Sequence, residues 1–370
     1  MFYGRIMRMS LIIIIFVAVM SLYAKQAFAQ KSPYDIGAVA ALKQGDKVQW
    51  HGYYEFEALN QDKQNATFDA HKITVWMGVK LSKIAFLSSE VEYERFPRLE
   101  AGEEPKGGSG EIKIDSAQLR LTPLDGTTGY FGIFYAPFGI EYLSYPGQKN
   151  KLVTRPKVMK SGGIIPGTWS VVGMGVNQVL KGVGQLDVYT VNGDAKNGGI
   201  SRDTKNGGNN SKSIAARIMF DKFIEGFNVG ASYISGKWDA NNQFDSIRYG
   251  AHIRVDSDVM TGIQFAPVLI AEYVTGIDEM NSSVDGRDKN VTGYYVQLSS
   301  RLLSALEIVG RYGEYDNDEK VADNGKTETS LGVVWHMTDG VQLKGEYQWN
   351  GEQGIAKDNN NAAVELVAYW

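Results

Sequence analysis

The amino-acid sequence predicts an all-β fold, a transmembrane antiparallel β-barrel of about 16 strands. Three observations lead to this prediction. Apolar and polar residues alternate with a period of two through most of the chain. The links between the alternating segments fall into a short class and a long class. The last alternating segment ends on the aromatic residue Trp370. A terminal strand with an aromatic residue on its apolar face is typical of a wall that must close in lipid, where no backbone edge can stay unpaired.

The N-terminus is typical of a secretory signal peptide. Arg5 and Arg8 precede an apolar run over residues 11–20, and Ala-Phe-Ala at 27–29 resembles a cleavage site. The apolar run is shorter than the roughly 20 residues that a membrane-spanning helix needs. We therefore expect residues 1–29 to be a signal peptide.

Composition excludes several classes of protein. The chain has 38 basic and 42 acidic residues, and three of the basic ones lie in the leader. The remaining chain therefore has 35 basic and 42 acidic residues, a net charge of −7, which gives no support to nucleic-acid binding. The chain has no cysteine, so it holds no disulfide, no lipid anchor and no thiolate metal site. No later segment has about 18 consecutive apolar residues.

The alternation is clearest near the C-terminus, where Val341, Leu343 and Tyr347 share one face and Lys344 and Glu346 the other. The expected strands cover residues 48–59, 70–81, 85–96, 111–123, 129–137, 170–180, 184–192, 212–220, 226–236, 244–255, 265–275, 290–300, 303–314, 326–337, 340–350 and 361–370. The strand over 111–123 changes face near Ser116, which predicts a β-bulge. The final strand should pair with 48–59 and close the barrel.

The links fall into two length classes. Short links include 82–84, 125–126, 221–225 and 338–339, and long polar links include 97–110, 138–169, 193–211, 276–289, 315–325 and 351–360. Short periplasmic turns and long outer loops are the barrel pattern. We expect a short periplasmic segment over 30–47 and a single barrel over 48–370; the alternative is a soluble β-sandwich.

One stretch is suited to ion selectivity. No acidic residue occurs from Tyr142 to Leu186, a stretch that includes the longest link. The candidate selectivity residues are Lys149, Lys151, Arg155, Lys157 and Lys160. If link 138–169 folds into the barrel as a constriction loop, these cations should attract anions. Alternatively the link is exposed and its cations contact lipopolysaccharide phosphates or solvent.

The inward register of the strands carries both signs of charge. Its basic members are Arg217, Arg248, Arg254, Arg301, Arg311 and Lys344, and its acidic members are Glu55, Glu57, Glu90, Glu92, Glu94, Glu272, Glu307, Glu346 and Glu365. Two arrangements are open, opposed charges that set up a transverse field and salt bridges within the wall. Aromatic residues near strand ends (Trp169, Tyr273, Tyr312, Trp335, Trp349 and Trp370) are expected at the membrane interfaces.

Catalysis is not expected. The four histidines, His51, His71, His252 and His336, are scattered, and no protease, hydrolase-elbow or P-loop motif occurs. The sequence therefore predicts no enzyme, no cofactor and no metal site.

The segment FGIFYAPFGIE at 131–141 resembles the phosphate-selective porin O and P family of Gram-negative outer membranes. Stretches at 188–194, 230–236, 269–276, 293–318 and 331–349 resemble the same family in the same order. The resemblance implies a trimeric outer-membrane porin for passive diffusion of small polar solutes, with an inward-folded constriction loop. Those porins carry a ladder of many arginines, whereas this chain has fewer inward arginines and many inward glutamates.

The resulting expectation is an anion-preferring, water-filled channel, with phosphate as one candidate solute. Its partners are the lipid bilayer, lipopolysaccharide and the outer-membrane assembly machinery, for which Trp370 is the expected assembly signal. The alternatives are a specific channel for sugars or organic acids and a plugged structural or adhesive barrel.

Overall fold

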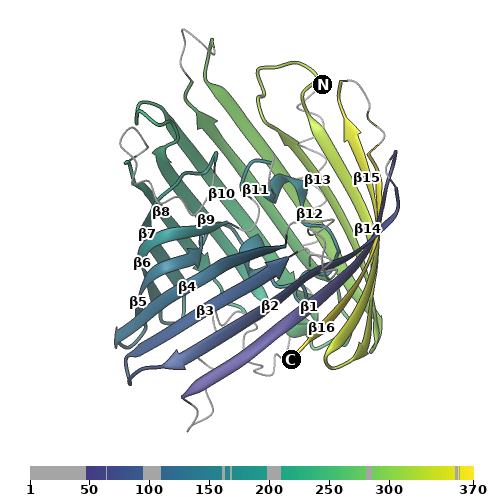
Figure 1. Cartoon of the computed structure of the whole chain (residues 1–370), viewed down its shortest axis with the longest axis horizontal. Helices are drawn as coiled ribbons and strands as arrows, with labels where there is room; N and C mark the ends of the chain where they lie inside the picture. Colours follow the sequence, from purple (N-terminus) through teal and green to yellow (C-terminus); the bar gives the residue numbers. More distant parts are fainter. Residues whose placement is uncertain are drawn as a thin grey trace, which may run out of the picture.

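The computed structural model describes residues 47–63, 65–94, 110–160, 163–166, 169–197, 210–280, 286–354, 357 and 359–370. Within these residues, 16 antiparallel strands form one closed barrel (Figure 1). The strands are β1 Val48–Gln61, β2 Thr67–Lys80, β3 Ala85–Glu94, β4 Glu111–Leu124, β5 Thr127–Tyr135, β6 Ser170–Leu180, β7 Gly184–Val191, β8 Ser213–Phe220, β9 Phe227–Lys237, β10 Asp245–Asp256, β11 Val268–Asp278, β12 Lys289–Leu303, β13 Leu306–Asp316, β14 Lys326–Thr338, β15 Val341–Glu352 and β16 Asn361–Tyr369. The short helices η2 Glu141–Ser144 and η3 Lys157–Met159 lie between β5 and β6, and α2 Ser257–Thr261 links β10 to β11.

The wall is inverted relative to a water-soluble sheet. On β14, Leu331 and Trp335 are 57% and 47% exposed, whereas Glu328 and Ser330 are 1% and 0% exposed. On this strand polar side chains face inward and large apolar ones outward, which is the alternation that a barrel wall in lipid requires, although the inward Val334 is apolar and 2% exposed. This arrangement, together with closure of the sheet, excludes the β-sandwich alternative.

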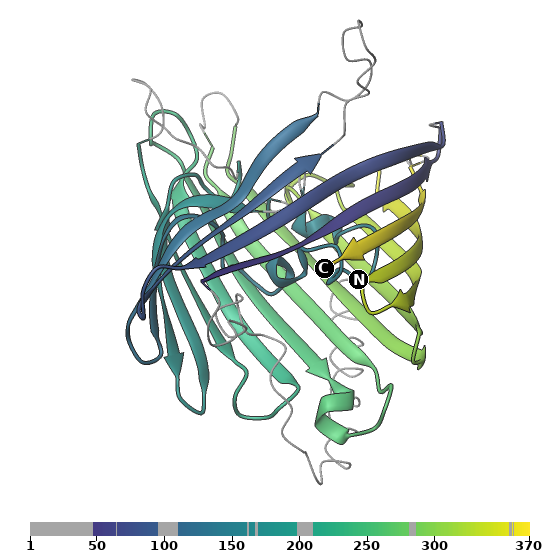
Figure 2. The same cartoon turned by 60° about the horizontal axis from the view of Figure 1, so that its bottom comes forward.

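The first and last strands close the barrel as predicted. β1 pairs with β16 antiparallel from Tyr53 opposite Tyr369 to Gln61 opposite Asn361, and Figure 2 shows the purple strand β1 beside the yellow strand β16. Glu365 faces inward and is 3% exposed, while Trp370 is 58% exposed. Both ends of the sheet are therefore paired, and no open edge remains in the wall.

Five strand pairs of the described wall have a register shift, and two of these shifts affect charged residues of the inner face. In β4 the register shifts between Ile114 and Ser116, and Asp115 and Ser116 are both buried, which confirms the predicted bulge. The other, which was not predicted, lies where β1 pairs with β2 around Phe56. Strand β11 begins at Val268 rather than at residue 265, because the chain is still turning after α2 with positive φ at Gly262 and Phe265.

Most of the predicted interfacial aromatics lie on the outer surface. Tyr273, Tyr312, Trp335 and Trp349 are 42–47% exposed. The prediction for Trp169 was wrong: this residue is 2% exposed and packs against Phe138 in the link between β5 and β6. The link folds back on the wall, so an aromatic residue just before a strand is enclosed.

The predicted signal peptide (1–29) and residues 30–46 lie outside the described residues. Among those that are described, no helix combines the length and apolar character needed to cross a membrane.

Candidate functional site

The link between β5 and β6 is fastened to the inner face of the wall at its start. The backbone N–H of Gly139 donates to Ser232 Oγ at 2.9 Å. The N–H groups of Ile140 and Glu141 donate to the Glu272 carboxylate at 3.3 and 3.2 Å. Both acceptors are buried on the polar face of their strands. Residues 138–169 are called the β5–β6 segment below; Figure 2 shows its teal turns within the ring of strands.

The middle of the segment contacts the opposite strands. Arg311 Nη1 donates to the Thr154 carbonyl at 2.8 Å, and the Thr154 N–H donates to Glu346 Oε2 at 2.6 Å. Lys344 Nζ donates to the Gly147 carbonyl at 2.7 Å. Inward charged side chains thus satisfy the backbone groups of a segment that has little regular structure of its own.

Apolar packing fixes the rest of the segment. Val158, Ile164 and Trp169 belong to one buried cluster with residues of β5 to β13. Leu152 packs separately with Val309 and Val334. Burial of these side chains and the hydrogen bonds above hold the segment in one position against the wall.

The five predicted selectivity residues differ in environment. Lys151 forms an ion pair with the buried Glu307, and Arg155 stacks on the Tyr145 ring with its guanidinium carbon 4.5 Å from the centroid. Lys149 and Lys160 are exposed and Lys157 is half-buried. In the described part of the chain, these three ammonium groups have no carboxylate within ion-pair distance, and two of them, Lys149 and Lys160, are also exposed.

The surroundings shift the ionisation of these lysines. Burial by the enclosing wall lowers the pKa of Lys149, although Glu90 opposes the shift. Burial likewise lowers the pKa of Lys157 and of Lys160, and Glu328 opposes it in both. Their side chains reach water, but the wall replaces part of the hydration of the charged groups. A partly desolvated ammonium group attracts an anion more strongly than one in bulk water.

The predicted wall cations are mostly neutralised within the wall. Arg217 pairs with Asp187 at 2.8 Å, Arg248 with Asp278 at 2.8 Å, Arg311 with Glu328 at 3.3 Å, and Lys344 with Glu365. All four cations are 1–2% exposed. Arg254 pairs with Asp256 at 2.9 Å, and Arg301 is exposed near the end of β12. Arg217, Arg248, Arg311 and Lys344 therefore form salt bridges within the wall rather than a charged lining that contacts solutes.

Strands β1, β3 and β4 carry an acidic wall, defined as Glu55, Glu57, Glu90, Glu92 and Asp115, each 3–8% exposed. Lys72 Nζ lies 3.5 Å from Glu55 and 3.0 Å from Glu92. Glu90 acts on the charge of Lys149. Buried carboxyl groups on the strands thus interact with exposed ammonium groups of the β5–β6 segment.

A cavity of about 320 Å³ adjoins the segment. Its lining includes aromatic rings and planar polar groups, among them Arg120, Tyr130, Tyr142, Asn177 and Asp187. Gln118 accepts a hydrogen bond from Arg120 Nε at 3.1 Å. The cavity can therefore take a small polar solute.

The sequence predicted that Glu272 and Glu346 face inward. It did not predict that their carboxylates accept hydrogen bonds from the backbone of the β5–β6 segment. It missed Ser232, and it missed Tyr295, whose hydroxyl donates to Glu141 Oε2 at 3.0 Å. The hydrogen bonds to Glu272 span 131 and 132 positions of sequence, and that to Glu346 spans 192. No local pattern in the sequence could have indicated these partners.

Comparisons with known proteins agree on one class. The family model for Gram-negative porins matches residues 17–354. No curated protein matches the chain. The finer resemblance to phosphate-selective porins stays a prediction, because the matching model is that of the broader family.

Solved structures of low sequence identity share the fold. An anion-selective porin from Comamonas acidovorans has a TM-score of 0.65 at 11% identity, with 87% of this chain and 99% of that chain covered. OprB of Pseudomonas putida has a TM-score of 0.61 at 13% identity, covering 93% and 100%. The trimer form of OmpT of Vibrio cholerae has a TM-score of 0.58 at 10% identity, covering 87% and 99%.

Proposed function

The chain belongs to the Gram-negative porin family and is an outer-membrane β-barrel, and from this premise we propose that it is a passive-diffusion channel with a mild preference for anions. The β5–β6 segment narrows the channel. Lys149, Lys157 and Lys160 set the preference, while Lys151 and Arg155 hold the segment in place.

One observation carries this proposal: the accessible charges near the segment are ammonium groups, whereas the facing carboxyl groups are buried. Lys149 and Lys160 are exposed, but Glu90 and Asp115 are only 8% and 6% exposed. A permeating ion therefore meets positive charge directly and negative charge through the wall, and rings of fixed charge determine selectivity in pores.

The assembly and the solute class are further parts of the proposal. We infer a homotrimer, supported by the trimer form named for OmpT. Among anions, phosphate is the candidate that the sequence resemblance adds. Phosphate should then reduce chloride current in a saturable way, and a channel without that preference should show no such block.

Reversal potentials across planar bilayers in a KCl gradient test the anion preference. Lys149→Gln combined with Lys160→Gln removes two of the three lysines and should strongly reduce the preference while leaving an open channel. Lys181→Gln is the matched control. Lys181 lies in the short turn between β6 and β7, is 83% exposed, and forms an ion pair with Asp125 at 3.0 Å. Cation preference of the wild type, or an unchanged reversal potential in the double variant, would contradict the proposal.

The cavity of about 320 Å³ favours a second candidate, a channel specific for sugars or organic acids. Aromatic rings beside Arg120 and Asn177 suit a solute that has both apolar and polar faces. Such a channel should show saturable block by its solute, and Tyr130→Ala should relieve that block. If the ion current shows no saturable decrease as the solute concentration rises, this candidate is excluded.

A further inference from the structure

The bulge between β1 and β2 brings a histidine to the inner face of the barrel. In the backbone register, Glu55 lies opposite Lys72 and Glu57 lies opposite Asp69. Phe56 therefore lies opposite two residues of β2 instead of one. Simple alternation from Lys72 would place His71 on the outer face. The extra residue re-aims it, and its ring contacts two inward carboxylates, those of Glu57 and Asp69.

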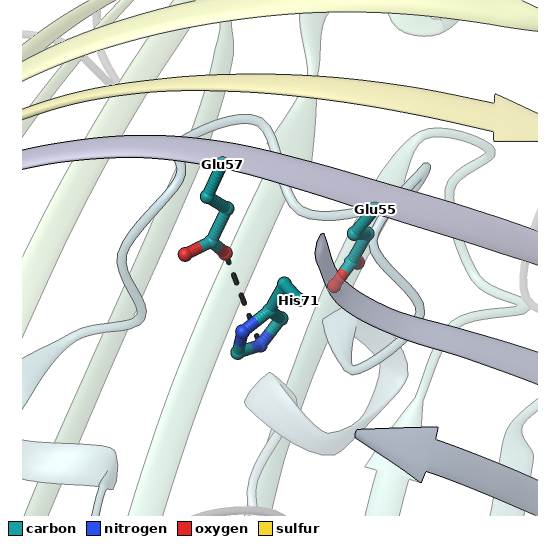
Figure 3. Close-up of side chains that lie close together, drawn as sticks. All are labelled: Glu55, Glu57 and His71. Atoms are coloured by element: carbon teal, nitrogen blue, oxygen red, sulfur yellow. Dashed lines mark ion pairs between the residues drawn. The ribbon is translucent and has the colours of Figure 1, made fainter. Parts of the chain in front are cut away.

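Glu55, Glu57 and His71 then point toward one another from two adjacent strands (Figure 3). One potential ligand atom from each lies within 4.8 Å of the other two. His71 Nε2 is 3.9 Å from Glu57 Oε1. Ligands about 2.1 Å from a tetrahedral ion lie roughly 3.4 Å apart, so small side-chain rotations would complete a site.

The other ring nitrogen of His71 is already held by a carboxylate. Nδ1 lies 3.4 Å from Asp69 Oδ2. Donation from Nδ1 to Asp69 leaves the lone pair on Nε2, which is the atom directed at Glu57. A carboxylate behind the imidazole is the usual outer-shell partner of a metal-bound histidine, because it fixes the tautomer and raises the basicity of the ring.

The surrounding charges favour a cation at this position. Glu57 is 8% exposed, and its cross-strand neighbour on β16 is another carboxylate, Glu365. Lys344 pairs with Glu365, and Lys72 lies between Glu55 and Glu92. In the described part of the chain, the basic side chain within 4 Å of the Glu57 carboxylate is the His71 ring alone, and that ring is charged only when it is protonated. A buried carboxylate is costly unless a cation compensates it.

We propose that Glu55, Glu57 and His71 bind a divalent transition-metal ion of the zinc type, with Asp69 as the orienting residue. One imidazole nitrogen and two carboxylate oxygens match zinc, with a water from the channel as the fourth ligand. Magnesium and calcium favour six or more oxygen ligands, so this set suits them less well. The His71 side chain is 28% exposed, so an ion can reach it from the channel.

The bound ion would join β1 to β2 beside the seam with β16. It would also add positive charge to the acidic wall, which faces the lysines of the β5–β6 segment. Zinc binding should therefore raise the resistance of the barrel to denaturation, because it favours the folded state.

Calorimetric titration of ZnCl₂ into the metal-stripped full-length protein in detergent tests the proposal. The wild type should bind one ion per chain. His71→Ala and Glu57→Gln should each weaken binding by at least about tenfold, and Asp69→Asn by about 10–100-fold. His336→Ala is the matched control: its Nε2 lies 3.5 Å from Glu307, with a comparable side-chain exposure of 22%, but it belongs to no three-ligand cluster among the described residues.

A variant with the opposite expected effect separates binding from damage to the fold. Lys72→Gln removes the cation that competes for Glu55 and should tighten zinc binding, whereas a merely damaged wall would weaken it. MgCl₂ should bind weakly and equally to wild type and His71→Ala. No saturable zinc binding, or an equal loss in His336→Ala and His71→Ala, would overturn the proposal. If His71→Ala does not assemble, Glu57→Gln and Lys72→Gln give the answer.

Discussion

The indole of Trp370 covers Gly52 on the outer face of the barrel, and the two residues exchange backbone hydrogen bonds of 3.1 and 3.2 Å. A Cβ added at Gly52 would lie 2.5 Å from Trp370 Cζ2 and 2.4 Å from the Thr74 carbonyl oxygen. The absence of a side chain at Gly52 is therefore what lets the terminal aromatic pack across the seam between β1 and β16. This contact is an aromatic ring covering a glycine of the neighbouring strand.

Gly52→Val should reduce the yield of folded barrel. Overpacking at such a site costs about 1–3 kcal/mol, and here one of the clashing atoms belongs to the backbone. The shift in gel mobility on heating measures the folded fraction. Gly345→Ala is the control, because a Cβ there meets nothing within 4 Å. Deleting Trp370 should have the same effect as Gly52→Val, and the surviving channels should keep their reversal potential; normal assembly of both variants would contradict this role of the seam.

Arg311→Met should destabilise the barrel by about 3–5 kcal/mol, because it leaves buried carboxylates without their cation. Arg311 Nε lies 3.3 Å from Glu328, and Nη2 lies 3.6 Å from Glu346. The same residue donates two hydrogen bonds to Thr154, so channel current should also become noisier. Denaturant unfolding followed by tryptophan fluorescence measures the change. Loss of the exposed Lys181–Asp125 pair should cost only about 0–1 kcal/mol.

Much of the wall was predictable from sequence because barrel strands obey a local rule. Alternation along Val341–Glu352 places Lys344 and Glu346 inside without reference to any other strand. The sixteen strands, the closing pair and the bulge at Asp115 all follow from such patterns or from their interruption.

The interior was less predictable because its contacts are long-range. The bulge that re-aims His71 interrupts no obvious pattern, since Ala70 fits either face. Trp169 was assigned to an interface because it precedes a strand, but the β5–β6 segment encloses it. The salt bridges of Arg217 and Arg248 join residues 30 positions apart, and the backbone partners of Glu346 lie more than 190 positions away. Their pairing depends on which strands meet and at what register.

Anion preference should fall as pH rises, beginning below the usual lysine pKa of 10.5. Burial lowers the pKa of Lys149, Lys157 and Lys160, so these groups lose their charge at a lower pH than exposed lysines do. Reversal potentials measured between pH 7 and the ordinary lysine range follow the change. The variant with Lys149→Gln and Lys160→Gln should respond much less. An identical pH profile for the two proteins would show that other groups set the preference.

The attachment of the β5–β6 segment should weaken as pH rises above the ordinary range of glutamate. Burial raises the pKa of Glu141, against the opposing effect of Arg155 and Arg311. Its Oε2 accepts a hydrogen bond of 3.0 Å from Tyr295, while Oε1 has no partner among the described residues. A carboxyl group with a raised pKa stabilises the folded arrangement fully below its unfolded pKa, and that stabilisation is lost as pH rises through the raised value.

Glu141→Gln keeps the shape and the contact with Tyr295 but cannot ionise. Open-channel current noise should therefore increase with pH in the wild type and stay flat in this variant. Glu314→Gln is a suitable control, because Glu314 accepts a hydrogen bond from Tyr294 on the wall but touches no residue of the β5–β6 segment in any hydrogen bond or ion pair of the described chain. If the noise of Glu141→Gln rises with pH as steeply as that of the wild type, ionisation of Glu141 does not control the attachment.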